Sequence, residues 1–214
     1  MNNRFAIILV ALILGFGGIL WFNKKKTENS SGKSNNAQLS QHTLGAGNKK
    51  VTLIEYGDFQ CPACAQYFPL IKQIEEKYGD DITFQFRNFP LIQIHNNAMA
   101  AHRAAEAAAN QNKFFEMHDA LYGQQKSWAD ASNPTPIFES FAGQLGLNLE
   151  QYKTDVASAK TNDIINADIA EGKKIGANST PTFVLDGKKI DNPNDLADFS
   201  KLIDEAIAAK KPTP

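Results

Sequence analysis

The sequence predicts an α/β fold in which a βαβ unit and a ββα unit are separated by a long all-helical stretch. Two β-branched and aromatic runs open the globular part, at residues 51–56 and 82–86, and a third follows at 182–185. Between the second and third runs, from residue 95 to 175, apolar residues recur at helical spacing without a strand pattern. An apolar segment ahead of the globular part adds one predicted transmembrane helix.

The predicted transmembrane helix rests on an apolar, uncharged run of 18 residues from Phe5 to Phe22. At about 1.5 Å per residue this run spans roughly 27 Å, close to the thickness of a bilayer's hydrocarbon core. Trp21 suits the interface, and the lysines at 24–26 follow directly. A cleaved signal peptide would need small residues at its end, which are missing here. We therefore expect an uncleaved N-terminal membrane anchor over residues 1–23.

Composition divides the rest of the chain into a linker and a domain. Residues 24–47 are rich in Lys, Asn, Ser and Gly and have few large apolar side chains. Such a segment cannot bury enough surface to offset its ordering entropy, which predicts a flexible linker. The domain is expected over residues 48–210, with the helical insertion at about 93–176.

Charge separates along the same boundary. The first 47 residues carry five basic and one acidic side chains, and the remainder carry 17 basic and 22 acidic ones. An acidic domain on a basic stalk argues against nucleic-acid binding and suits a protein held at a membrane surface. The four histidines lack metal-ligand spacing, so no metal site is expected.

The first predicted unit is strand, helix, strand. Strand 51–56 ends at Gly57, and Pro62 is well placed at the first position of the following helix. Pro69 lies inside that helix and should bend it. Strand 82–86 alternates apolar and polar residues. Because the whole unit fits within about 40 residues, the two strands should pair in parallel through a right-handed crossover.

The middle of the chain predicts consecutive helices. Residues 98–109 contain eight alanines, which strongly favour a helix. Apolar stripes predict further helices at residues 114–122, 137–145, 148–156 and 164–174. Asn148, with Gln151 three residues later, resembles a capping box.

The last predicted unit is a hairpin and a helix. Strand 182–185 is followed by Asp186-Gly187, a strong tight-turn signal, so residues 188–190 should pair back. The final helix should run from about residue 194 to 209, with one apolar face.

The chain has only two cysteines, Cys61 and Cys64, in the segment Cys-Pro-Ala-Cys. Structural disulfides would be spread along the chain, and a zinc site would need two further ligands nearby. The pair therefore indicates a dithiol that cycles between open and closed states, so thiol–disulfide exchange is the leading hypothesis. Half of a metal site shared with another chain is the alternative.

The two cysteines are expected to differ in acidity. Cys61 lies directly ahead of a helix, where unpaired backbone N–H groups and the helix dipole favour the thiolate. Cys64 lies one turn inside the helix. We therefore expect Cys61 to be the exposed attacking sulfur and Cys64 the sulfur that resolves the mixed disulfide. Thiols in such motifs have pKa values of roughly 3.5 to 7.

Four separated blocks carry a family resemblance: Glu55–Cys64, Phe86–Pro90, Gln111–His118 and Ser179–Phe183. In this order they resemble the signature blocks of DsbA-like thiol–disulfide oxidoreductases, and most of all the membrane-tethered bacterial members of the Bdb type. The resemblance covers roughly residues 45–208. It implies a thioredoxin fold interrupted by a helical insertion, with a redox-active dithiol and no cofactor.

The resemblance also implies roles for four further residues. It implies that Thr180-Pro181 is a cis-proline loop that faces the dithiol and pairs with extended substrate; an ordinary strand-start proline is the alternative. It implies that Glu55 is a buried acid that shuttles the proton of the resolving cysteine, and desolvation would raise its pKa. The alternative for Glu55 is a solvent-facing position at a strand end. The kink at Pro69 is expected to be structural.

The sequence departs from the best-known oxidase of this family at Ala63, where that enzyme has a histidine that helps to stabilise its thiolate. Alanine cannot do so, and Cys61 should therefore be less acidic than in the most oxidising relatives. This departure leaves the direction of electron flow open.

Three functional hypotheses follow. The first is a dithiol oxidase that donates its disulfide to unfolded or thiol-containing exported proteins and is recharged by a quinone-linked membrane partner. The second is a reductase or isomerase using the same site. The third is a non-catalytic module that binds metal or unfolded chains.

The side of the membrane depends on two opposing arguments. The positive-inside rule weighs Arg4 against the three lysines at 24–26 and would place the domain in the cytoplasm. A dithiol oxidase needs an oxidising compartment, and a chain without other cysteines avoids wrong pairing there. Family members of this form face outward. We therefore expect a single-pass protein of the cell membrane with an extracytoplasmic domain.

Overall fold

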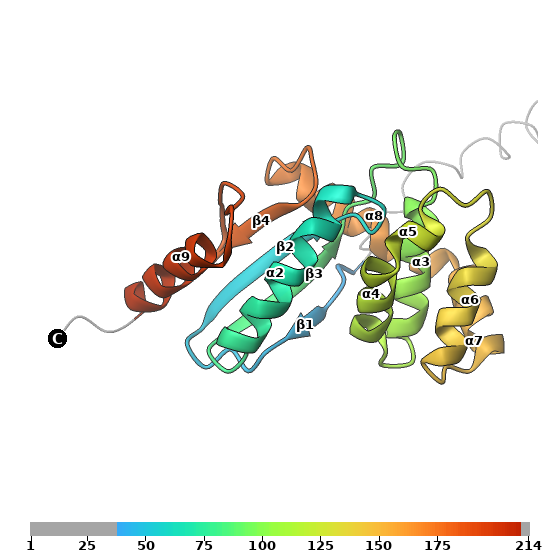
Figure 1. Cartoon of the computed structure of the whole chain (residues 1–214), viewed down its shortest axis with the longest axis horizontal. Coiled ribbons are helices and arrows are strands. Elements are labelled where there is room, and N and C mark those ends of the chain that lie inside the picture. The colour runs from blue at the N-terminus through green and yellow to red at the C-terminus, as the bar shows by residue number, and fades with distance from the viewer. Residues whose placement is uncertain (1–37, 211–214) are drawn as a thin grey trace, which may run out of the picture. The chain divides into compact units, whose positions relative to one another are not determined.

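The computed structural model describes residues 38–210. In chain order its elements are β1 (His42–Leu44), β2 (Val51–Gly57), α2 (Pro62–Tyr78), β3 (Ile82–Asn88), α3 (Ala98–Ala109), α4 (Phe114–Gly123), α5 (Gln125–Trp128), α6 (Thr135–Gln144), α7 (Leu149–Val156), α8 (Ala159–Lys174), β4 (Thr182–Leu185), β5 (Lys188–Lys189) and α9 (Leu196–Ala209) (Figure 1). The predicted anchor, residues 1–23, lies outside the described residues. Within residues 38–210, none of the helices has the length and apolar character needed to cross a membrane.

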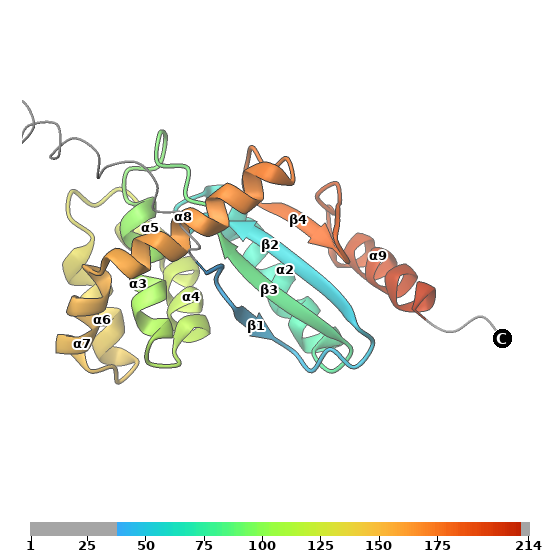
Figure 2. The same cartoon turned by 180° about the vertical axis from the view of Figure 1, so that it is seen from behind.

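The sheet has the strand order β1-β3-β2-β4-β5. Strands β2 and β3 pair in parallel, from Val51 opposite Ile82 to Gly57 opposite Asn88, with α2 as the connection. The other neighbouring strands pair antiparallel, including the β4–β5 hairpin. Helices α2 and α8 lie on opposite faces of the sheet, as the two views show (Figures 1 and 2). The expected βαβ and ββα units are confirmed.

The alternation of side chains along β2 decides which residues lie beneath α2. Successive residues of a strand point to opposite faces, so Leu53 and Glu55 share one face and Ile54 and Tyr56 share the other. Leu53 belongs to the main core cluster, whereas Tyr56 belongs to a small second cluster. That second cluster lies under α8, where Gly172 packs against the Tyr56 ring. Glu55 is therefore a carboxyl group on the main-core face.

The segment between β3 and β4 is helical, as expected, and residues 89–181 contain no strand. The alanine-rich helix α3 has the predicted bounds, and its small side chains let the neighbouring helices pack closely. At the start of α7 the Asn148 side chain accepts a hydrogen bond from Gln151 N at 2.9 Å, which confirms the predicted cap. The short helix α5 was not predicted.

The structure corrects the predicted linker, which was expected to extend to residue 47. Strand β1 lies inside that range and pairs antiparallel with β3, with His42 opposite Phe86. Gly45 and Gly47 then turn the chain toward β2 with positive φ angles of 89° and 65°. Residues 38–47 therefore belong to the domain. The three-residue run His-Thr-Leu is too short and polar to give a strand signal by itself.

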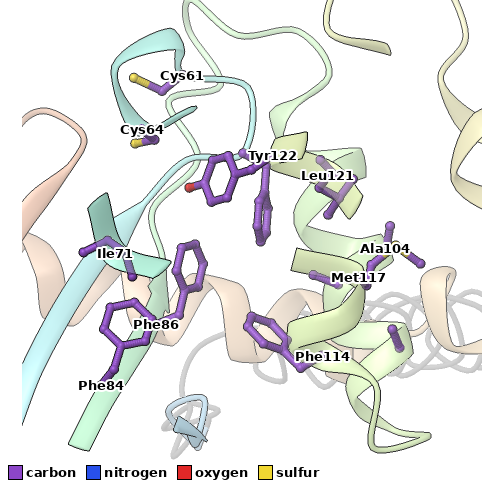
Figure 3. Close-up of a cluster of buried hydrophobic side chains, with 14 of the residues drawn as sticks. Cys61, Cys64, Ile71, Phe84, Phe86, Ala104, Phe114, Met117, Leu121 and Tyr122 are labelled. Carbon is purple, nitrogen blue, oxygen red and sulfur yellow. The ribbon is translucent and has the colours of Figure 1, made fainter. Parts of the chain in front are cut away.

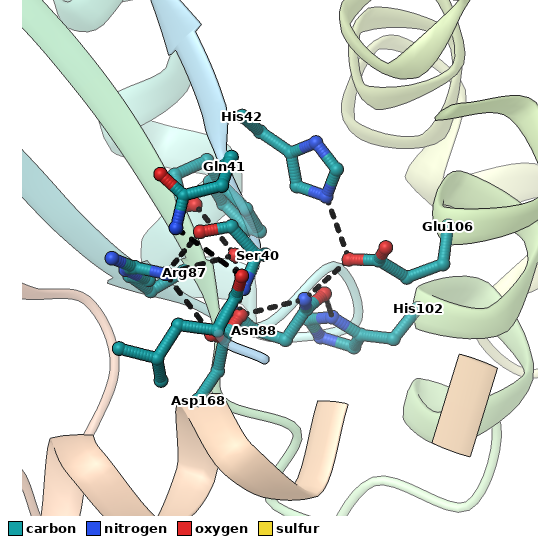
Figure 4. Close-up of polar contacts among 10 residues, drawn as sticks. Ser40, Gln41, His42, Arg87, Asn88, His102, Glu106 and Asp168 are labelled. Atoms are coloured by element: carbon teal, nitrogen blue, oxygen red, sulfur yellow. Dashed lines mark hydrogen bonds and ion pairs between the residues drawn. The ribbon is translucent and has the colours of Figure 1, made fainter. Parts of the chain in front are cut away.

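A buried polar network ties this first strand to the rest of the domain (Figure 4). Its centre is the carboxylate of Asp168 on α8, which is fully buried. Asp168 accepts hydrogen bonds from the Ser40 hydroxyl at 2.6 Å, from Ser40 N at 3.0 Å and from the Asn88 side chain at 2.9 Å. Arg87 Nη1 lies 3.3 Å from the same carboxylate. The buried carboxylate is thus paired with a cation and with hydrogen-bond donors.

Candidate active site

The two cysteines lie where helix α2 begins (Figure 3). Cys61 is the N-cap residue, with an extended backbone (φ −68°, ψ 122°), and Pro62 starts the helix. Both thiols are free. Cys61 keeps 7% of its surface exposed and Cys64 none. Cys61 is therefore the more accessible of the two cysteines, and its role as the attacking sulfur stays a prediction.

The environments of the two thiols drive their acidities apart. The pKa of Cys61 is lowered from 9.0 to about 5, first by a hydrogen bond from the Cys64 thiol. Burial opposes this effect, while Thr180 and the backbone N–H groups of Cys64 and Ala63 add to it. The pKa of Cys64 is raised well above 9.0, first by burial, then by its hydrogen bond to Cys61 and by the charge of Glu55. At neutral pH the reduced site therefore holds one thiolate and one thiol.

This split in acidity arises although Ala63 contributes no side-chain donor. The groups that lower its pKa are the second thiol, Thr180 and the N–H groups of the first helical turn. A pKa of about 5 lies between the roughly 3.5 and roughly 7 found for strongly oxidising and reducing motifs of this type. The first turn of α2 and Thr180 together thus stabilise the thiolate without a side-chain donor at position 63.

Glu55 is 2% exposed, so the alternative of a solvent-facing glutamate is wrong. Its pKa is raised from 4.5 to about 8, first by burial and then by the negative charges of Cys61 and Glu75. A carboxyl group with this pKa exchanges its proton near neutral pH. The charge of Glu55 in turn raises the pKa of Cys64, so ionisation of either group disfavours ionisation of the other.

The loop before β4 lies against the dithiol. Cys61 Sγ lies 3.4 Å from the carbonyl oxygen of Thr180, across 119 positions of sequence, and donates to it when the thiol is protonated. The Thr180-Pro181 peptide bond is cis, as expected from the resemblance. On the far side of the loop, the Asn192 side chain donates to the Pro181 carbonyl oxygen at 3.0 Å. The structure therefore brings Thr180 and Pro181 together with Cys61.

The backbone that leads into Cys61 is held by the buried carboxylate of Asp58. One oxygen accepts from Gln60 N at 2.8 Å, and the other accepts from Leu91 N at 2.8 Å and lies 2.7 Å from His95 Nδ1. Sequence analysis did not identify this group. An aspartate two residues before a polar residue is common in turns, so this pattern does not single out Asp58 in the sequence.

The helical insertion also fixes the dithiol segment. The Gln125 side chain, from α5, donates to the carbonyl oxygens of Phe59 at 2.8 Å and Cys61 at 3.0 Å. In return the Gln60 side chain donates to Ala129 O at 2.7 Å and accepts from Asn97 N at 2.7 Å. These contacts join segments more than 35 residues apart. No local sequence signal could have revealed them.

Histidine and acidic side chains do not gather into a metal site in residues 38–210: no group of three or more possible ligands is placed to hold an ion. His102 and His118 instead pack as rings, His102 against Phe59 at 4.7 Å and His118 against Tyr122 at 5.0 Å between centroids. Burial lowers the pKa of His102 to about 4. Both histidines are therefore neutral core residues at physiological pH.

Comparison with known proteins identifies the family and the fold of the chain. The model of a family described as Thioredoxin matches residues 37–205. The chain therefore belongs to the thioredoxin family, and its fold is that of the DsbA-like thiol–disulfide oxidoreductases.

Solved structures show the same architecture. BdbD from Bacillus subtilis, in its oxidised form, superimposes with a TM-score of 0.70 at 21% identity, over 80% of this chain and 97% of that one. The α-DsbA1 protein of Wolbachia pipientis gives 0.69 at 22% identity, over 83% and 98%. A thioredoxin-like oxidoreductase from Silicibacter pomeroyi gives 0.68 at 22% identity, over 85% and 100%.

Similar segments also occur inside much longer proteins. The Na⁺/H⁺ antiporter NhaA 1 of Mycobacterium sp. (strain KMS) is 33% identical over 167 residues, which are 76% of this chain and 26% of the antiporter. The antiporter NhaA 3 of Salinispora tropica is 31% identical over 173 residues, 81% of this chain and 26% of that protein. The chain thus spans about a quarter of the length of these curated relatives.

Proposed function

We propose that the protein is a dithiol oxidase that transfers a Cys61–Cys64 disulfide to thiol-containing exported proteins. The observation that carries this proposal is the split in acidity, with the pKa of Cys61 at about 5 and that of Cys64 well above 9. A stabilised thiolate lowers the free energy of the reduced state. The corresponding disulfide is therefore readily reduced, which makes it an oxidant.

The transfer proceeds in two exchange steps. A substrate thiolate attacks Cys61 Sγ; the bond between the two protein sulfurs breaks, and Cys64 leaves as a thiolate that takes a proton from Glu55. A second substrate thiolate then attacks the substrate sulfur of the mixed disulfide, and Cys61 leaves as a thiolate. The substrate loses two electrons and the protein gains them. A thiol with a low pKa leaves readily as a thiolate, so the low pKa of Cys61 favours its departure in the second step.

The Thr180 loop is proposed to bind the substrate next to the attacked sulfur. Its support is the 3.4 Å contact between Cys61 Sγ and the Thr180 carbonyl, because a chain that reaches Cys61 must pass this backbone. An extended segment paired with Thr180 beside Pro181 would bring its own thiol to the exposed side of Cys61. Main-chain pairing of this kind accepts many sequences, which suits unfolded substrates.

The setting is proposed from the sequence of residues 1–23 and from the needs of the chemistry. An anchor there would hold the domain at the outer face of the cell membrane, in an oxidising compartment. Each turnover leaves the dithiol reduced, so a membrane partner linked to quinones is proposed to reoxidise it. A cysteine placed at Ser31 should react with an impermeant thiol reagent on intact cells; reaction only after lysis would overturn the topology.

A reductase or isomerase using the same residues is the second candidate, and Ala63 is the observation in its favour. Without a side-chain donor at this position, the pKa of Cys61 is higher than the roughly 3.5 of the strongest oxidants.

The proposed function is tested with a reduced, unfolded secreted enzyme as substrate. The oxidised protein should restore its disulfides and activity, and Cys61→Ser should abolish this transfer. If Cys61→Ser remains able to complement a deletion strain, the protein is a binding module and catalysis is excluded. A reductase would leave the reduced substrate unchanged and would instead reduce its native disulfides.

A further inference from the structure

A tyrosine from the helical insertion lies directly behind the dithiol. Tyr122, on α4, is 5% exposed, and its hydroxyl points toward the sulfur of Cys64 (Figure 3). The hydroxyl oxygen is completely buried; within residues 38–210 it makes no hydrogen bond of good geometry, although it approaches the Cys64 side chain. A buried hydroxyl without a partner destabilises the fold, so we expect this hydroxyl to gain a hydrogen-bond partner in another state of the site.

The backbone of β2 leaves room for this hydroxyl. A Cβ atom at Gly57 would lie 2.9 Å from the Tyr122 oxygen and 2.5 Å from the Phe86 ring. Glycine at this position therefore lets the phenol approach the sheet behind Cys64. Aromatic neighbours hold the ring, since the Phe59 and His118 centroids both lie 5.0 Å away. The orientation of the hydroxyl is thus fixed by packing.

Opening the disulfide creates a charge at this place. Cys64 leaves as a thiolate while it is 0% exposed, so water cannot solvate the charge as it forms. The environment also keeps the proton on the Tyr122 hydroxyl. Burial first, then the negative charges of Cys64, Glu55 and Asp58, and last the approach of the hydroxyl to the Cys64 side chain, raise the pKa of the phenol well above 10.0. It therefore remains an O–H donor throughout the physiological range.

We propose that the Tyr122 hydroxyl donates a hydrogen bond to the Cys64 sulfur as the disulfide opens, stabilising the departing thiolate until Glu55 protonates it. Tyr122 keeps its own proton, so the balance of protons and electrons is unchanged. The inference rests on the proposed exchange chemistry of Cys61 and Cys64, and it holds for either direction of electron flow. The helical insertion would then supply a donor to the reacting sulfur as well as bracing the site.

The test measures how fast dithiothreitol opens the disulfide of the full protein. Tyr122→Phe keeps the ring and removes only the donor, so opening should slow about tenfold. Tyr152→Phe is the matched control, because Tyr152 is a buried tyrosine of the same insertion on α7, away from the dithiol. An unchanged rate in Tyr122→Phe, or an equal fall in the control, overturns the proposal.

A second measurement separates hydrogen bonding from packing. In the Cys61→Ala background, the pKa of Cys64 is followed by the NMR shift of its isotopically labelled β-carbon. Adding Tyr122→Phe should raise this pKa by about one unit, the equivalent of a tenfold change. Slow opening without a raised pKa overturns the proposal, because lost packing would then explain the rate.

Two further outcomes are decisive. Should Tyr122→Phe not fold, a ring-fluorinated tyrosine at position 122 keeps the shape and is a stronger donor, so opening should accelerate; an unchanged or slower rate contradicts the inference.

Failure of the proposed function is a different result: the oxidised wild-type protein would transfer no disulfide to substrate. The pKa comparison in the Cys61→Ala background would still decide the role of Tyr122.

Discussion

Cys61 Sγ lies 3.4 Å from the carbonyl oxygen of Thr180, although 119 positions separate the two residues. This contact joins the βαβ unit to the ββα unit at the start of α2. It places an acidic thiol beside a backbone that can receive an extended chain. The proposed substrate position depends on this one contact.

The acidity of Cys61 should depend on its partner sulfur more than on the helix alone. The rate of alkylation of Cys61 in the reduced protein, followed against pH, should show a midpoint near 5. Cys64→Ala removes the first cause of the low pKa, so the midpoint should rise toward the ordinary value of about 8.5. A midpoint that stays near 5 in Cys64→Ala would assign the effect to the backbone N–H groups instead.

The reduction potential should change slope with pH near the pKa of Cys61. Below about pH 5, reduction takes up two protons with two electrons, and the potential should fall by about 59 mV per pH unit. Between about pH 5 and 7 only Cys64 is protonated, and the slope should be about 30 mV per unit. Equilibration with glutathione over this range measures it. A uniform slope of about 59 mV would contradict a Cys61 thiolate.

Glu55 should destabilise the fold at neutral pH. Its folded pKa of about 8 lies above the unfolded value of 4.5, so the unfolded chain loses this proton first as pH rises. The folded state is therefore penalised progressively between about pH 4.5 and 8. Glu55→Gln should stabilise the reduced protein at pH 7 by on the order of 2 kcal/mol and should have little effect at pH 4.

Urea unfolding at both pH values measures the effect of Glu55→Gln, and Glu76→Gln is a control on the exposed surface. The same variant should slow disulfide opening, because glutamine has no proton to give to Cys64. Equal stability of Glu55→Gln and the wild type at pH 7 would show that the carboxyl is not desolvated.

The first strand should depend on the buried carboxylate of Asp168. Asp168→Ala leaves the charge of Arg87 and the polar groups of Ser40 without their partner, so unfolding should become easier by about 3–5 kcal/mol. Ser40→Ala removes one hydrogen bond and should cost about 1 kcal/mol. Denaturant unfolding measures both. If Ser40→Ala and Asp168→Ala cost the same, the network is not organised around the carboxylate.

Local signals predicted much of this domain. The eight alanines fixed the bounds of α3, Asp186-Gly187 marked the hairpin, and the position of Cys61 before Pro62 identified an N-cap thiol. Each of these depends on interactions within a few residues, which a single sequence displays directly. The resemblance added the cis-proline loop, since spacing alone left Pro181 ambiguous.

The parts of the fold and the site that the sequence did not reveal depend on contacts between residues far apart in the chain. Strand β1 is held by its pairing with β3 and by Ser40, which precedes the strand and binds Asp168, 128 positions away. Gln125 reaches the dithiol backbone from a four-residue helix with no periodicity to detect. In the sequence, Tyr122 is one residue of the apolar stripe over residues 114–122. Its hydroxyl became informative only once the fold placed it behind Cys64.

The reduction potential of the Cys61–Cys64 pair at pH 7 tests the central claim most directly. An acidic Cys61 beside a buried, non-acidic Cys64 stabilises the reduced state, so the potential should lie closer to the roughly −120 mV of the strongest dithiol oxidants than to the potentials of reducing thioredoxins. A value near the roughly −270 mV of reducing thioredoxins would contradict the account and assign the same site to disulfide reduction.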